Sequence, residues 1–218
     1  MRGAVLHAPG DIRVEDRPDP KIENPTDAVI RLAATCVCGS DLWPYRGIES
    51  VNGPAPMGHE YVGIVEEVGS DVTTLKPGQF VVGSFFASDN TCEICLAGYQ
   101  SRCVHAELVG ALGTQAEYAR IPLADGTLVA TPGMPSDDLV PSLLAASDVL
   151  GTGWFAAVAA EAGPGKTVAV VGDGGEPAGA EHVGGGHQAG DQVVGRHVGS
   201  GDQRAVGKRD AGVLGLGA

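Results

Sequence analysis

The sequence predicts a mostly β protein in three parts: a barrel-type β domain over residues 1–135, the start of an α/β domain over 136–174, and a disordered or irregular tail over 175–218. Three observations predict this order. Short segments broken by Gly and Pro fill the chain as far as residue 130. Ala- and Leu-rich segments follow from residue 136. Beyond residue 174, neither a helical nor a strand period can be found.

The first part contains three segments with the pattern of strands. Residues 27–33 alternate and are rich in β-branched side chains, and residues 61–68 lead into a Gly-Ser-Asp turn. Residues 80–86 follow a Lys-Pro-Gly turn. Short strands separated by such turns are typical of a β-barrel.

The second part changes from helix to strand. Residues 141–151 and 153–162 are predicted helices, and the second ends at a Gly-Pro-Gly sequence. Residues 167–171 (TVAVV) are short and wholly apolar, as in a strand buried within a parallel sheet.

Gly172-Asp173-Gly174 follows that strand directly. A strand that runs into Gly-x-Gly opens a dinucleotide-binding βαβ unit of the Rossmann type, so Gly172 and Gly174 are candidate cofactor-binding residues. The third glycine of the loop is replaced by Pro177, which has no N–H group to offer a pyrophosphate.

The tail has an unusual composition. Of the 45 residues from 174 to 218, 14 are Gly, and 31 are of types whose codons begin with G. Another 12 are of types whose codons can begin with C, which leaves only Ser200 and Lys208. We therefore expect a shifted reading of a G/C-rich gene from near codon 174. The alternative is a genuine Gly-rich linker, although linkers also tend to carry Ser, Thr and Asn.

The composition excludes several classes of partner. The formal net charge of −13 argues against nucleic acid and against an anionic membrane, because both require a basic face. No apolar run approaches the roughly 20 residues of a membrane span. The N-terminus is interrupted early by Pro9 and Gly10 and lacks the apolar core of a signal peptide. The predicted location is the cytoplasm.

Two groups of residues have the chemistry of zinc ligands. One consists of Cys38-Gly39-Ser40-Asp41, Gly58-His59-Glu60 and the distant Asp148. A catalytic zinc needs about three protein ligands and one open position, and thiolate, imidazole and carboxylate are all accepted donors. The other is a tight loop with Asp89, Cys92, Cys95 and Cys103. Clustered cysteines in a cytosolic chain indicate metal rather than disulfides.

In order and spacing, CGSD, then GHE, then a Val- and Gly-containing strand resemble the zinc-dependent medium-chain alcohol dehydrogenases, whose N-terminal domain is GroES-like. The resemblance covers residues 1–174. It implies a catalytic zinc on Cys38, His59 and Asp148, with Glu60 as a carboxylate that enters or leaves the metal shell. It also implies a proton relay through Ser40, and a carboxylate, Asp41, that orients the ligand histidine.

The same resemblance assigns a structural zinc lobe. The family has four cysteines there, and Asp89 stands at the first place, ahead of Cys92, Cys95 and Cys103. Carboxylate oxygen is an allowed zinc donor, but a degenerate lobe without metal is the alternative. Cys36 has no place in either group and is predicted to be a buried free thiol. The run 113–119 (GTQAEYA), expected to be a barrel strand, resembles the family and carries no chemistry that the sequence names.

The resemblance implies hydride transfer between a small-molecule alcohol or aldehyde and NAD or NADP, with the nicotinamide near Thr152. Intact relatives are expected to be homo-oligomers. Because residues 175–218 lack the helix and strands of a dinucleotide fold, we expect weak cofactor binding and impaired activity. The alternative is a non-catalytic zinc-binding GroES-like fragment. A zinc-free quinone reductase is disfavoured, because it would have no use for the cysteines.

Overall fold

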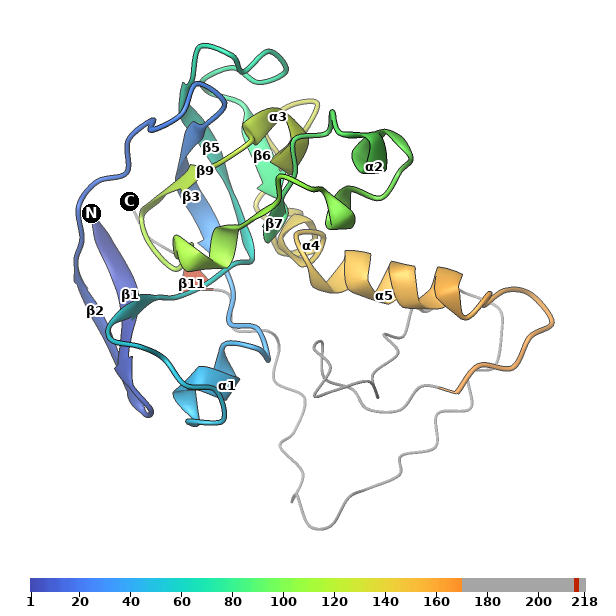
Figure 1. Cartoon of the computed structure of the whole chain (residues 1–218), viewed down its shortest axis with the longest axis horizontal. Helices are drawn as coiled ribbons and strands as arrows, with labels where there is room; N and C mark the ends of the chain where they lie inside the picture. The colour runs from blue at the N-terminus through green and yellow to red at the C-terminus, as the bar shows by residue number, and fades with distance from the viewer. Residues whose placement is uncertain (170–213, 216–218) are drawn as a thin grey trace.

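The computed structural model describes residues 1–169 and, for the backbone alone, Leu214–Gly215 (Figure 1). Three sheets make up the described β structure, in the orders β2-β1-β4, β10-β6-β5-β3-β11 with β9 also on β3, and β7-β8. The strands are β1 (Arg2–Ala8), β2 (Asp11–Asp16), β3 (Ala28–Thr35), β4 (Ala55–Pro56), β5 (Tyr61–Val68), β6 (Phe80–Gly83), β7 (Phe86–Ala87), β8 (Glu107–Leu108), β9 (Tyr118–Ile121), β10 (Leu128–Ala130) and β11 (Leu214–Gly215).

Short helical segments connect strands β1–β10, and two further helices follow β10. They are α1 (Leu42–Tyr45), α2 (Glu93–Leu96), η1 (Gln100–Arg102), η2 (Val109–Ala111), α3 (Ala124–Thr127), α4 (Val140–Ala145) and α5 (Val149–Ala159). No helix of the described part of the chain is long and apolar enough to cross a membrane.

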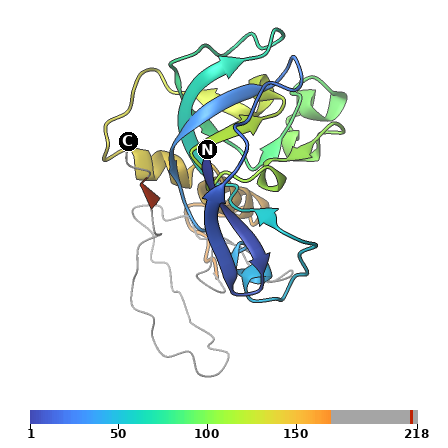
Figure 2. The ribbon, with the colours of Figure 1, turned by 90° about the vertical axis from the view of Figure 1, so that its left-hand side faces the viewer.

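The antiparallel pair β3 and β5 forms the middle of the large sheet. Their register runs from Ala28 opposite Val68 to Thr35 opposite Tyr61. The predicted strand 61–68 is confirmed, and that predicted over 27–33 lies at 28–35. Both strands are rich in β-branched and apolar residues, and their inward side chains are fully buried in the main core. The β1–β2 hairpin lies at one side of this sheet (Figures 1 and 2).

Three predicted elements differ from the structure. The strand expected over 80–86 is broken at residues 84–85, because β6 pairs with β5 and β10 whereas β7 pairs with β8. In the run 113–119 only the last residues are in a strand, β9. Residues 167–169 are not in a strand, since a parallel strand needs neighbours and none pairs with them in the described chain.

The tail lies mostly outside the described residues. Val170, Val171, Gly172 and Gly174 are among those not described, and so is the predicted irregular stretch 175–218 except for β11. β11 is a two-residue strand that pairs with β3 and that the sequence did not predict.

Helices α4 and α5 meet at a different place from the predicted break. The sequence placed the break at residues 151–153, whereas α4 ends at Ala145 and α5 begins at Val149. Gly151 and Gly153 lie inside α5, and a glycine in a helix interior costs only about 1 kcal/mol. Leu144 fixes the bend by packing into a small core with side chains of β3, β5 and β6. In Figure 1, α5 extends away from the barrel.

This packing yields a stability prediction. Leu144 is 2% exposed, so Leu144→Ala should lower the free energy of unfolding by about 2–5 kcal/mol, measured by denaturant titration. Leu139→Ala is the matched control, because Leu139 is 48% exposed and its loss should change the value by no more than about 0.5 kcal/mol. Equal losses in the two variants would show that α4 is not anchored through Leu144.

Candidate metal centres

The first predicted group of ligands comes together at one end of the β3–β5 pair. Cys38 follows β3, His59 and Glu60 precede β5, and Asp148 lies between α4 and α5. One ligand atom from each of the four residues lies within 4.8 Å of the others. Cys38, Glu60 and Asp148 are buried, and the His59 side chain is 14% exposed. We call these four residues the catalytic cluster.

The strand register explains this convergence. Thr35 is opposite Tyr61, so the residues just after β3 and just before β5 leave the sheet at the same end. The Thr35 hydroxyl donates a hydrogen bond of 2.8 Å to the Glu60 carbonyl oxygen and fixes that end. Asp148 reaches the same place because α4 packs against β3 and β5 through Leu144.

The His59 ring is oriented from both of its nitrogens. Nδ1 lies 3.5 Å from Asp41 Oδ1, and Nε2 lies 3.5 Å from Asp148 Oδ2. Ser40 Oγ is 3.4 Å from the same Nε2. Nδ1 therefore faces the orienting carboxylate, while Nε2 faces the other cluster residues. This is the arrangement in which metal-binding histidines are usually held.

The electrostatics of the cluster favour a cation. Burial alone would lower the pKa of His59, but hydrogen bonds with Asp148 and Asp41 outweigh it and raise that pKa to about 12. Burial raises the pKa of the Cys38 thiol. Thiol and carboxylate groups gathered in a buried site are stable only when a positive charge or a proton balances them.

Glu60 has one partnered and one unpartnered oxygen. The Cys36 thiol donates a hydrogen bond of 2.6 Å to Glu60 Oε2, whereas Oε1 is buried and has no hydrogen-bond partner among the described residues. The prediction of a buried free thiol at Cys36 is confirmed, and burial with this bond raises the pKa of the thiol. The contact with Glu60 was not predicted.

Thr152 lies in the first turn of α5, next to the catalytic cluster. Its hydroxyl donates a hydrogen bond of 2.9 Å to Asp148 Oδ1, and its N–H donates to the Asp148 carbonyl oxygen. The residue expected near the nicotinamide is thus in contact with the cluster.

The second predicted group forms a separate cluster, which we call the lobe cluster. Ligand atoms of Asp89, Cys92, Cys95 and Cys103 lie within 4.8 Å of one another. Asp89 Oδ1 accepts hydrogen bonds from the Thr91 and Cys92 N–H groups at 2.9 and 3.1 Å and lies 3.3 Å from Cys103 Sγ. None of the five cysteines forms a disulfide.

The short helix α2 places two of the lobe thiols. Cys92 precedes it, and the Cys95 N–H donates to the Cys92 sulfur at 3.4 Å. N–H groups, that of Val104 foremost and that of Cys95 next, lower the pKa of Cys92 to about 7. Burial raises the pKa of Cys95 to about 12.

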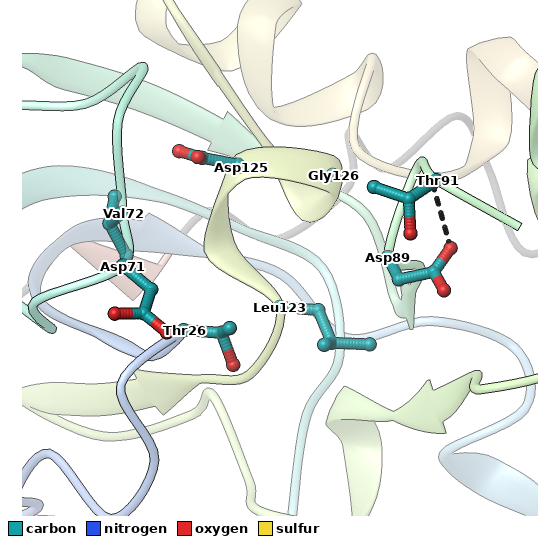
Figure 3. A pocket seen from close by; sticks show the side chains of 8 residues that line it. All are labelled: Thr26, Asp71, Val72, Asp89, Thr91, Leu123, Asp125 and Gly126. Atoms are coloured by element: carbon teal, nitrogen blue, oxygen red, sulfur yellow. Dashed lines mark hydrogen bonds between the residues drawn. The ribbon is translucent and has the colours of Figure 1, made fainter.

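A cavity of 230 Å³ lies beside the lobe cluster, and no residue of the catalytic cluster lines it (Figure 3). Asp89, Asp71 and Asp125 contribute to its wall. Asp125 accepts hydrogen bonds from the N–H and hydroxyl groups of Thr73 and Thr74 at 2.6–3.0 Å. These bonds lower the pKa of Asp125 against the opposing effect of burial. The Asp125 carboxylate is therefore already engaged in hydrogen bonds that join α3 to the segment at residues 73–74.

Sequence reasoning missed three side chains at these clusters. The Phe85 ring meets the His59 ring edge-on with centroids 6.1 Å apart. His105 Nδ1 lies 2.5 Å from Asp89 Oδ2. Gln115 donates to Asp41 Oδ2 at 3.1 Å. His105 could have been found from its place two residues after Cys103, whereas the other two contacts depend on distant pairing.

Comparisons with known proteins identify the family. The family described as the alcohol dehydrogenase GroES-like domain matches residues 24–133. Medium chain reductase/dehydrogenase ucsI from Acremonium sp is 43% identical over 169 residues, which cover 76% of this chain and 57% of that protein. Zinc-type alcohol dehydrogenase B from Aspergillus flavus is 45% identical over 161 residues, covering 72% and 37%.

A solved structure agrees with these relatives. Alcohol dehydrogenase TADH from Thermus sp. ATN1 superposes with a TM-score of 0.73 at 32% identity, over 79% of this chain and 51% of that one. The chain belongs to the zinc-type medium-chain alcohol dehydrogenase family and contains its GroES-like domain. The predicted family and the mostly β fold class are thereby confirmed. The chain spans about half the length of the curated relatives it matches.

The thiols of the lobe cluster yield a pH prediction. In chelator-treated protein, iodoacetamide should modify Cys92 before Cys95, because only thiolates react and the pKa of Cys92 is about 7 against about 12 for Cys95. The Cys92 rate should rise with pH through neutrality, as followed by mass spectrometry of the peptides. In Cys92→Ser this fast phase should disappear. A fast phase that persists would show that another cysteine is the reactive one.

Proposed function

We propose that this chain forms the zinc-binding, substrate-facing part of a dehydrogenase that transfers hydride between a small alcohol or aldehyde and NAD or NADP. One observation carries the proposal: Cys38, His59, Glu60 and Asp148, which are far apart in the sequence, bring their ligand atoms within 4.8 Å of one another. The related proteins named zinc-type alcohol dehydrogenases support it.

The donor set fits zinc. It combines one thiol, one imidazole and two carboxylates, all accepted zinc donors. Glu60 Oε1 is buried without a described partner, which is the condition of an oxygen that lacks a cation. We assign Cys38, His59 and Asp148 as ligands and Glu60 as the carboxylate that can join them. Zinc held there would supply a Lewis acid that polarises a substrate oxygen.

Three residues around the cluster would serve the reaction. Asp41 holds the imidazole through Nδ1 and so presents Nε2 to the cluster. Ser40, half-buried beside His59, connects the cluster with solvent and is the proposed carrier of the proton. Thr152, bound to Asp148, marks the side on which the nicotinamide would lie.

The cofactor and domain assignments stay predictions. Gly172 and Gly174, the candidate pyrophosphate contacts, lie outside the described residues. The boundary proposed after residue 135 falls between the end of β10 at Ala130 and the start of α4 at Val140. The cytoplasmic location, the homo-oligomer of intact relatives and the shifted reading of residues 175–218 also stay predictions.

One observation favours the alternative of a non-catalytic zinc-binding fragment. Leu150, Trp154, Phe155 and Val158 on α5 are 57–73% exposed, and residues 167–169 have no strand partner in the described chain. A helix apolar on its exposed side normally packs against another element. Under this alternative, the chain would bind zinc at both clusters but would lack the surface on which NAD(P) binds.

The following experiment tests the proposed function. The 218-residue chain should hold two zinc ions by mass spectrometry, and His59→Ala should hold one. Titration with NAD and NADP and an assay of alcohol-dependent nicotinamide reduction then separate the two candidates. Turnover supports the dehydrogenase, whereas bound zinc without turnover supports the fragment. Equal zinc content in the His59→Ala variant and the unchanged chain would refute the catalytic-cluster assignment.

A separate prediction concerns the lobe cluster, in which we assign Asp89, Cys92, Cys95 and Cys103 as ligands of a structural zinc. Asp89→Ala should lose about one zinc per chain and lower the melting temperature, because structural zinc contributes folding free energy directly. Asp71→Ala, which removes another aspartate from the wall of the adjacent cavity, should do neither. Unchanged zinc content in Asp89→Ala would exclude Asp89 as a ligand.

A further inference from the structure

Gln115 lies in the run 113–119, to which the sequence assigns no chemistry. We propose that it is a positioning residue of the catalytic cluster, and that it sets the geometry of Asp41 and hence of His59. This inference rests on the proposed function, because it concerns how the same cluster holds its metal.

The Gln115 amide joins two acceptors of the loop that carries Cys38. Its Nε2 donates to Asp41 Oδ2 at 3.1 Å and to the Cys36 carbonyl oxygen at 3.2 Å. Cys38 lies between these two acceptors in the chain, and its N–H donates to the same Asp41 Oδ2 at 2.9 Å. One amide group therefore fixes both ends of the segment that presents the thiol.

The backbone at residues 114–115 binds the segment that directly precedes His59. The Gln115 N–H donates to the Met57 carbonyl oxygen at 2.9 Å, and the Thr114 N–H donates to that of Gly58 at 3.0 Å. Gly58 has φ +93°, and a Cβ built on it would lie 2.5 Å from Gln115 Cγ and 2.6 Å from Gln115 N. Only glycine allows this approach directly before His59.

The two oxygens of the Asp41 carboxylate have different partners. Oδ2 accepts from Cys38 N and Gln115 Nε2, which leaves Oδ1 to face His59 Nδ1 at 3.5 Å. Asp41 is 7% exposed, so water cannot easily replace a lost donor. Without the amide, Asp41 loses a restraint on its rotation, and His59 loses part of its orientation.

A neutral amide donor suits this position. Glutamate has the same length but would place a second carboxylate against buried Asp41, where like charges repel. Methionine has a similar length and volume but no N–H group. The two replacements therefore remove the hydrogen bonds in different ways while they largely preserve packing against Gly58.

The test is metal retention by the whole chain. Zinc-loaded Gln115→Met and Gln115→Glu should release the catalytic-cluster zinc to a chelator with an affinity lower by about 10–100-fold, the usual effect of losing a group that orients a metal ligand. The lobe zinc should be released as in the unchanged chain. His59→Ala and Cys95→Ser identify which release phase belongs to which cluster. Cobalt substitution adds a readout, because its absorption reports the ligand geometry.

Gln79→Leu is the matched control. Gln79 also makes a side-chain hydrogen bond, with the Lys76 N–H at 2.7 Å, but in a turn that contacts neither cluster. It should leave both release phases unchanged. Unchanged release and cobalt spectra in both Gln115 variants would overturn this inference alone. Loss of both metals together with a lower melting temperature in both variants would overturn it in favour of a general folding role. Equal metal content in His59→Ala and the unchanged chain would overturn the proposed function and this inference with it.

Discussion

The pairing of β3 with β5 is the interaction on which the catalytic cluster depends. Thr35 stands opposite Tyr61, and this register places the residues after one strand beside those before the other. A slip of one residue would turn the side chains of a strand to the opposite face. The buried side chains of both strands oppose such a slip, because it would move them out of the main core. The thiol and the imidazole therefore meet as a consequence of core packing.

The two clusters bring their ligands together by different means. The lobe cluster lies within 15 residues of sequence, and N–H groups of that segment contact Asp89 and Cys92. The catalytic cluster spans residues 38–148 and needs the barrel and α4 to be in place. Its buried carboxylates need a positive charge beside them, which a metal ion or the protonated His59 ring would supply.

This difference also explains what the sequence could predict. The three lobe cysteines and strand 61–68 depend on local clustering and residue pattern, which are visible in the sequence, whereas Asp89 was placed by resemblance to the family. Residues of the catalytic cluster were recognised only by resemblance to a family, because no local pattern joins Asp148 to Cys38. The break between α4 and α5 was misplaced because both sides of it are rich in Ala and Leu, whereas a buried contact of Leu144 with the barrel fixes it. The role of Gln115 was missed because its partners lie 74 and 79 residues away.

Asp148 links the cluster to the part of the chain that follows the barrel. The other three cluster residues lie at the ends of β3 and β5, whereas Asp148 stands between two helices. Leu144 anchors it on one side, and Thr152, in the first turn of α5, binds its carboxylate on the other. The same helix exposes Trp154 and Phe155. Any element that packed on this apolar side would therefore bear on α5 and, through Thr152, on the position of one proposed zinc ligand.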